Sequence, residues 1–232
     1  DDAAAEKKST DTEYADGNIT ISVKTLREDD TDIYVADVEL SSAEYLKTAL
    51  AENTYGRNVK ESTSAIAQEN NAILAINGDF YGSRLNGYVI RNGVLYRSSA
   101  AKGNEDLVIY ADGSLGIIEE SEISAEALLD KGAQQVLSFG PALIENGDIS
   151  VSESEEVGKA KASNPRTAIG LINDLHYVFV VSDGRTSASK GLSLYELARF
   201  MKSLGVKTAY NLDGGGSSTM YYQGRVINNP TT

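Results

Sequence analysis

Cysteine is absent from the 232-residue sequence, which excludes disulfide frameworks, thiolate nucleophiles and cysteine-ligated zinc. The single histidine, His176, lies in an apolar stretch that predicts a strand. We therefore interpret it as a structural sheet residue rather than the base of a serine-histidine-aspartate triad. The sequence also lacks the G-x-S-x-G turn and the G-x-x-x-x-G-K-[ST] loop, so neither an α/β-hydrolase nor a P-loop nucleotidase fits.

Basic residues and long apolar runs are also scarce. The 21 Lys and Arg residues are outnumbered by 34 Asp and Glu residues, giving a net charge of −13. This balance argues against duplex nucleic acid or an anionic bilayer as a partner, since both need a basic surface. No apolar run approaches the length of a membrane span, so we expect no transmembrane segment. Any anionic ligand must be held by a few local groups.

The N-terminus is polar and of low complexity, which is typical of a linker. We predict a flexible linker over residues 1–16 and one domain over residues 17–232. Such a linker suggests a tether that follows an export signal or membrane anchor, so we expect an extracellular or cell-envelope-anchored protein. The alternative is an ordinary disordered N-terminus of a cytoplasmic protein.

The patterning predicts an α+β fold, with a mixed, largely antiparallel sheet and packed helices in a single catalytic domain. Residues 72–76 form a short continuous apolar run that indicates a buried strand. Residues 151–163 have no period and predict a mobile loop. Helices are expected after Ser41, at 63–70, 124–131 and 193–205, and hairpins at 19–40, 88–96, 107–118, 141–149 and 166–185.

Three apolar strands each end in an aspartate beside glycine, at Asp79, Asp183 and Asp213. If these ends lie at one edge of the sheet, the three carboxylates converge on one cleft, where catalytic groups commonly lie. Aspartate next to glycine is also ordinary turn chemistry, which is the alternative for each position.

The groups around these ends narrow the chemistry. Carboxylates serve as acid, base or nucleophile in glycosyl transfer, or bind a hard cation such as calcium. Arg166 and Arg185 offer planar charged forks for phosphate. The glycines and serines after Asp213 offer N–H and hydroxyl donors to the same anion. Together they predict a substrate that carries both a sugar and a phosphate, while the need for a metal stays open.

Several segments between residues 72 and 230 form a recognisable set of motifs: residues 75–81, 138–141, 164–170, 183–185 with 191–193, and 211–220. The asparagine-proline-arginine-threonine segment at 164–170 and the aspartate-glycine-serine segment at 211–220 are the most specific. With these segments the sequence resembles the phosphodiester glycosidase family, whose bacterial relatives are often labelled exopolysaccharide biosynthesis proteins. The sequence departs from the family pattern by ending soon after Asn229-Pro230 and by lacking the cysteine-rich additions of vertebrate members.

The resemblance implies a hydrolase that cleaves the bond between an anomeric carbon and a phosphodiester, on a bacterial cell-surface glycan or teichoic-acid-like polymer. The alternatives are a calcium-dependent glycan-binding module without turnover and a phosphodiesterase that cleaves the P–O bond. The implied catalytic residues are Asp79, Asp183 and Asp213, with no role assigned to each. The implied substrate-binding residues are Asn77, Arg166, Thr167, Arg185, Gly215, Gly216, Ser217 and Ser218.

Overall fold

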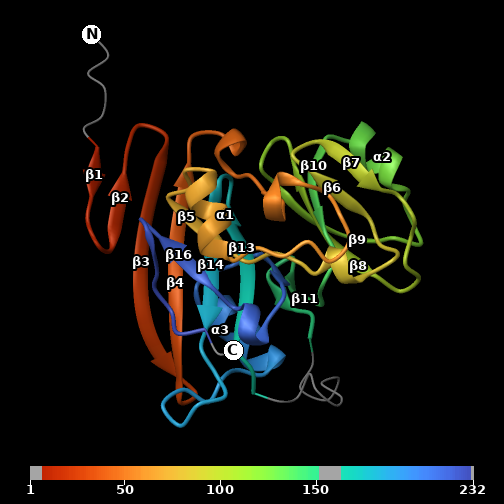
Figure 1. The fold of residues 1–232 in the computed structure, drawn as a ribbon. Coiled ribbons are helices and arrows are strands. Elements are labelled where there is room, and N and C mark those ends of the chain that lie inside the picture. The colour runs from red at the N-terminus through yellow and green to blue at the C-terminus, as the bar shows by residue number, and fades with distance from the viewer. Residues whose placement is uncertain (1–6, 152–162, 231–232) are drawn as a thin grey trace.

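The computed structural model describes residues 7–151 and 163–230. Its strands form three sheets, and every pairing among the described strands is antiparallel. One sheet has nine strands, one has five and one has three. Figure 1 shows the five-stranded sheet beside the nine-stranded sheet, and the three-stranded sheet in front of the nine-stranded one. Most of the predicted loop at 151–163 lies outside the described residues.

The largest sheet has nine strands and contains the two long hairpins, residues 19–40 and 166–182. The turn between β3 (Ile19–Glu28) and β4 (Thr31–Leu40) is Asp29-Asp30, where both residues have positive φ values, as a tight hairpin turn requires. In spatial order the strands are β1 (Lys8–Ser9), β2 (Glu13–Ala15), β3 (Ile19–Glu28), β4 (Thr31–Leu40), β14 (His176–Ser182), β13 (Arg166–Asn173), β15 (Thr208–Asn211), β11 (Ala142–Glu145) and β12 (Asp148–Ile149).

The other two sheets are smaller and also contain predicted hairpins. Asn92-Gly93 joins two neighbouring strands of the five-stranded sheet, as that turn sequence predicts. The five strands are, in order, β7 (Val94–Arg97), β6 (Val89–Arg91), β10 (Ala133–Leu137), β8 (Glu105–Tyr110) and β9 (Leu115–Glu119). The three-stranded sheet contains β17 (Arg225–Val226), β16 (Met220–Tyr222) and β5 (Leu74–Ile76). The residues of β5 are half-buried rather than fully buried as predicted.

Three short α-helices occur in the described residues: α1 (Thr63–Glu69), α2 (Ala125–Asp130) and α3 (Leu194–Ser203). Helix α3 begins with the predicted capping box, because Ser193 and Glu196 each accept a hydrogen bond from the other's backbone N–H. Helix α3 also connects β14 to β15. The connection through α3 passes over β13, so β15 pairs with β13 and not with β14. Both β14 and β15 are antiparallel to β13. None of the described helices is long and apolar enough to span a membrane.

The structure corrects the prediction of a mixed sheet with packed helices. The described sheets are purely antiparallel, and the fold is dominated by strands. The expected helix after Ser41 is only a 3-10 turn at Ala43–Tyr45, capped by Ser42. Ser41 instead donates its hydroxyl proton to the Asn18 side chain, and its N–H to the Asn18 carbonyl, which ties it to the start of β3.

Strands β1 and β2 lie inside the predicted linker. Tyr14 of β2 is 7% exposed and belongs to the main hydrophobic core. Residues 8–15 therefore contribute strands to the large sheet, and residues 1–6 lie outside the described ones. Low-complexity composition did not indicate this, because the segment is held by one buried tyrosine and by hydrogen bonds from Tyr222 and Gln223 to the Thr10 carbonyl, more than 200 residues away.

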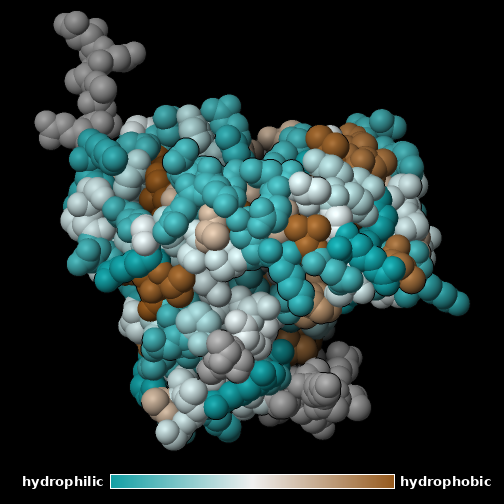
Figure 2. Space-filling view, in the orientation of Figure 1, coloured by the Kyte–Doolittle hydropathy of each residue, from teal (hydrophilic) through white to brown (hydrophobic). Residues whose placement is uncertain are grey.

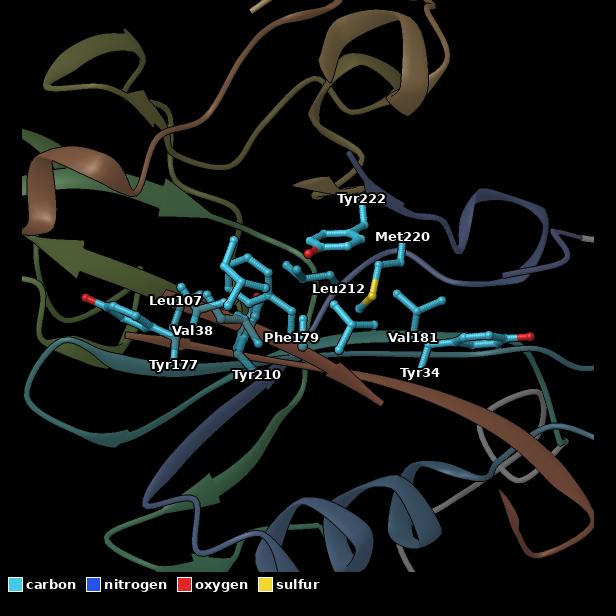
Figure 3. Packing of buried hydrophobic residues seen from close by; sticks show 14 of the residues in the cluster. Tyr34, Val38, Leu107, Tyr177, Phe179, Val181, Tyr210, Leu212, Met220 and Tyr222 are labelled. Carbon is cyan, nitrogen blue, oxygen red and sulfur yellow. The ribbon is translucent and has the colours of Figure 1, made fainter. Parts of the chain in front are cut away.

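Two hydrophobic cores lie on opposite faces of the large sheet, as strand alternation requires. In β14, Tyr177, Phe179 and Val181 face the main core, whereas Val178 and Val180 face α3. Figure 3 shows Met220 and Tyr222 packed over Phe179 and Val181, so the main core joins the small sheet to the large one. A third core lies between the five-stranded sheet and α2. The face shown in Figure 2 is mainly hydrophilic with separate small apolar patches, in keeping with the acidic composition.

Candidate active site

A groove of about 1330 Å³ lies where β5 and β15 end, and we call it the Asp213 groove. The backbone N–H of Asp213 donates to the Gly78 carbonyl at 3.0 Å, so two of the three predicted strand ends meet directly. The lining residues that matter for the chemistry are Asn77, Asp79, Phe80, Asp213, Gly216 and Ser217.

Asn77 fixes the geometry of this junction. Its side-chain N–H donates to the Asp213 carbonyl at 2.6 Å. Its side-chain oxygen accepts hydrogen bonds from the Thr167 hydroxyl at 2.8 Å and the Thr219 N–H at 3.1 Å. Asn77 thus links β5, β13 and both ends of the glycine-rich loop. The structure places it as a positioning residue for Asp213.

Asp213 is the most available of the three predicted catalytic carboxylates. It is half-buried and lines the groove. Burial raises the pKa of Asp213, while the Ser217 hydroxyl and the Gly214 N–H lower it; the charge of Asp79 raises it further and Arg84 lowers it. A carboxylate that lines a groove and is partly desolvated is suited to act as a base or nucleophile.

Asp79 also lines the groove, but both of its oxygens are occupied. Arg91 donates to one at 2.7 Å and the Ser138 N–H to the other at 2.9 Å. The Asp79 and Arg91 side chains are 2% and 5% exposed. Asp79 is therefore one half of a buried ion pair beside Asp213, and each of its oxygens already accepts a hydrogen bond.

Asp183 lies away from the groove. Its side chain accepts hydrogen bonds from the Asn228 side chain at 3.1 Å and the Asn229 N–H at 3.0 Å. Burial raises the pKa of Asp183, and the bonds from Asn228, Tyr34 and Asn229 lower it. Asn228 also donates to the Ser218 carbonyl, so Asp183 supports the glycine-rich loop from behind. The structure therefore brings Asp79 and Asp213 together and leaves Asp183 apart.

Arg166 and Thr167 point to opposite faces of β13, because neighbouring strand residues alternate. Thr167 is fully buried and reaches Asn77 on the groove side. Arg166 is 8% exposed, and its Nε donates to the Leu192 carbonyl at 2.9 Å, next to the core that contains α3. Neither residue is among the described residues that line the groove.

Arg185 lies beside the glycine-rich loop. It is exposed, and its guanidinium donates two hydrogen bonds to the Asn164 side chain. A Cβ atom on Gly215 would lie 3.4 Å from that guanidinium, whereas a Cβ on Gly214 would lie 2.7 Å from the Pro165 carbonyl oxygen. Only glycine permits the latter approach, so the loop is held closely against Pro165.

The predicted binding residues of the loop divide into two groups. Gly216 and Ser217 are exposed and line the groove, in the 3-10 turn Gly215–Ser217. Ser218 is 1% exposed, and its hydroxyl has no hydrogen-bond partner among the described residues. Ser217 is therefore the loop serine best placed to contact a ligand. The binding roles of all these residues stay predictions.

Sequence reasoning missed Phe80 and Arg84, which follow Asp79 in the same loop. Phe80 lines the groove and is 50% exposed, and the charge of Arg84 acts on Asp213. Arg97 donates to the carbonyls of Tyr81, Arg84 and Gly87, which fixes this loop. The sequence did contain a signal for these two residues, because aromatic and basic residues follow directly after the strand-end Asp79.

His176 has the structural role predicted from the sequence. Its Nε2 lies 2.9 Å from both carboxylate oxygens of Asp37, on the neighbouring strand. Within the described ranges, Asp37, Glu39 and His176 are the group of potential ligands spaced closely enough to share a metal ion. They do not line the Asp213 groove.

Comparison with known proteins supports this fold and identifies the family. The phosphodiester glycosidase family model matches residues 70–232. The SPbeta prophage-derived uncharacterized protein YomE of Bacillus subtilis is 32% identical over 182 residues, which is 75% of this chain and 28% of that protein. N-acetylglucosamine-1-phosphodiester α-N-acetylglucosaminidase of Mus musculus is 33% identical over 176 residues, 68% of this chain and 33% of that enzyme.

The solved catalytic domain of the zebrafish N-acetylglucosamine-1-phosphodiester α-N-acetylglucosaminidase, auto-inhibited by its pro-peptide, has a similar fold. Its TM-score is 0.71 at 22% identity, over 98% of this chain and 80% of that one. Fold and groove together define an antiparallel sheet protein with an acidic site at converging strand ends. The chain belongs to the phosphodiester glycosidase family, as its motifs predicted. It spans about a third or less of the length of the curated relatives described above.

Proposed function

We propose that this protein is a hydrolase that cleaves the glycosidic bond of a sugar-1-phosphodiester. The observation that carries the proposal is Asp213, a half-buried carboxylate with a raised pKa that lines a groove beside an arginine and a glycine-rich loop. The name of the mouse relative describes the same kind of bond.

The ion pair between Asp79 and Arg91 leaves Asp213 as the more available of the two strand-end carboxylates, so we place the chemistry on Asp213. Ionised Asp213 activates water or attacks the anomeric carbon directly. The bond from that carbon to the phosphate oxygen breaks, and its electron pair leaves with the phosphate. Phosphate is a good leaving group, so little general-acid assistance is needed. Gly216 and Ser217, which line the same groove, offer donors to the charge that develops on the phosphate, and the positive charge of Arg84, which acts on Asp213, favours the same anion.

We further propose a phosphodiester of a bacterial cell-surface glycan or a teichoic-acid-like polymer as the substrate, and an extracellular or envelope-anchored location. The size of the groove supports a long ligand, since its 1330 Å³ exceeds the roughly 300–1,000 Å³ typical of small-molecule sites. Because the net charge of the protein is −13, the surface as a whole repels a phosphate, and the phosphate must be held by a few groups in the groove.

Incubation with UDP-GlcNAc in ¹⁸O-labelled water tests the reaction. Glycosidic cleavage by attack at carbon releases N-acetylglucosamine that carries the label and leaves UDP unlabelled. Label in the phosphate would identify a phosphodiesterase instead. Binding of the sugar phosphate, measured by calorimetry, without any turnover would support the glycan-binding module and overturn the proposal.

Phe80 is expected to stack on the substrate, because it is a half-exposed aromatic ring that lines the same groove as Asp213. The Phe80→Ala variant should raise KM about tenfold, equivalent to roughly 1.4 kcal/mol of binding, with little change in kcat. Leu85→Ala is the matched control, since Leu85 is 68% exposed and is not among the described groove residues. Equal KM values for the two variants would remove Phe80 from the binding site.

A further inference from the structure

The Asp213 groove extends from the strand ends to the main hydrophobic core. Leu212, which directly precedes Asp213, lines the groove together with Val38 and Phe179 of the nine-stranded sheet, and all three belong to that core. Six half-buried aliphatic residues at the edge of the same core also line the groove. We call this part the apolar arm, and its residues are Ile19, Leu40, Leu46, Ile73, Leu74 and Ile76.

Strand β5 contributes two residues to the apolar arm, and its burial is unusual for its composition. A continuous apolar run such as residues 72–76 is typical of a strand that is buried on both faces. All three residues of β5 are instead half-buried, because β5 is an edge strand that lines the groove. Protein interiors are packed as densely as organic crystals, so an apolar strand beside an open groove lacks part of its packing surface. An apolar ligand would supply that surface.

The two parts of the groove differ in chemistry. Asp213 and Ser217 offer charge and hydrogen bonds at the strand ends, and exposed residues such as Lys47 and Lys60 give the groove a polar rim. The side chains of the apolar arm offer neither charge nor hydrogen bonds, and cavities with such walls bind apolar molecules. A peptide fits the arm less well, because each peptide N–H and C=O needs a polar partner. A hydrocarbon chain needs none.

We propose that the apolar arm holds an aliphatic chain on the second ester of the phosphodiester, so that the substrate is a sugar linked through phosphate to a lipid. This inference rests on the proposed function, because it takes Asp213 as the site of cleavage. The phosphate then lies near Asp213, and the chain runs past Leu212 into the arm. Among cell-surface glycans, this selects those that are carried on a lipid phosphate.

The reaction on such a substrate is an ordinary hydrolysis. Water adds a hydroxyl group to the anomeric carbon, and the bond from that carbon to the phosphate oxygen breaks. The electron pair of this bond leaves with the alkyl phosphate, which also takes the second proton of the water. The products are the free sugar and an alkyl phosphate that keeps its chain in the apolar arm.

The ethyl and dodecyl diesters of N-acetylglucosamine-1-phosphate, used below the micellar concentration, test this proposal with the whole protein. KM for the dodecyl diester should be about 100-fold lower, which corresponds to only three or four buried methylene groups. Cleavage of both diesters with equal KM would overturn this inference and leave the proposed function intact. Failure to cleave either diester or UDP-GlcNAc would overturn the proposed function itself, and this inference with it.

A variant locates the chain in the arm. Leu46→Trp narrows the arm and should lower the ratio of kcat/KM for the dodecyl diester to that for the ethyl diester about tenfold. Leu26→Trp is the matched control, since Leu26 is 37% exposed on β3 and is not among the described groove residues, and it should keep the wild-type ratio. Equal ratios in the two variants would place the chain outside the arm and contradict the proposal.

Binding of the product keeps the test decisive if Leu46→Trp does not fold. Calorimetry with wild type should show that dodecyl phosphate binds about 100-fold more tightly than ethyl phosphate, because the two ligands differ only in the chain. Equal affinities of wild type for the two phosphates would show that no part of the groove holds the chain, and the proposal would be wrong.

Discussion

Asp213→Asn should lower kcat for release of sugar from UDP-GlcNAc by about 10³-fold, because the amide cannot act as a base or nucleophile. The substitution keeps the shape of the side chain and removes the strand-end carboxylate of the groove that is not held in an ion pair. Asp148→Asn, which removes an exposed carboxylate from an edge strand, should retain full activity. Wild-type turnover by Asp213→Asn would show that the protein is not a glycosidase of the kind proposed.

The same variant should be more stable than wild type at neutral pH. Burial raises the folded-state pKa of Asp213 above its ordinary value of 3.8. Wild-type stability from this group is therefore fully present below pH 3.8 and is lost as pH rises through the raised pKa. The asparagine of Asp213→Asn does not ionise, so the variant avoids this loss. Its free energy of unfolding in urea should exceed that of wild type at neutral pH, and the difference should shrink as pH falls toward 3.8. A less stable but inactive variant would leave misfolding as the cause of inactivity.

Local turn chemistry explains which parts of the fold were predictable. Asn92-Gly93 and Asn146-Gly147 fix two-residue hairpins, and their strands occur as predicted. The capping box at Ser193 likewise fixes the start of α3. The helix expected after Ser41 failed because Ser41 bonds to Asn18, a contact 23 residues away that local patterning cannot reveal.

The site was predictable in its motifs but not in the state of each side chain. Alternation along β13 places the Arg166 and Thr167 side chains on opposite faces of the sheet, which the sequence pattern already implied. Asp79 and Asp213 look equivalent as strand-end aspartates. They differ because Arg91, in a hairpin strand, reaches back to pair with Asp79. Availability for catalysis is set by such pairing and by burial, which depend on the tertiary structure.

Breaking the Asp79–Arg91 pair should produce the largest loss of stability. The Arg91 side chain is 5% exposed. In Asp79→Asn its charge stays buried without an anionic partner, although its hydrogen bond to the Val136 carbonyl remains. Removing one partner of a buried ion pair costs about 3–5 kcal/mol. Urea unfolding of wild type and variant at neutral pH measures this difference. Glu13→Gln, which removes the exposed pair with Lys8, should leave the free energy of unfolding unchanged within error.

A double-mutant cycle separates the ion pair from simple loss of packing. Arg91→Met should also be strongly destabilising, because it leaves the Asp79 carboxylate buried with only the Ser138 N–H as a partner. The double variant Asp79→Asn with Arg91→Met should be less destabilised than the sum of the single variants, since neither charge is then left unpaired. Additive effects would mean that the two side chains act independently. In that case Arg91 would not be what makes Asp79 less available for chemistry than Asp213.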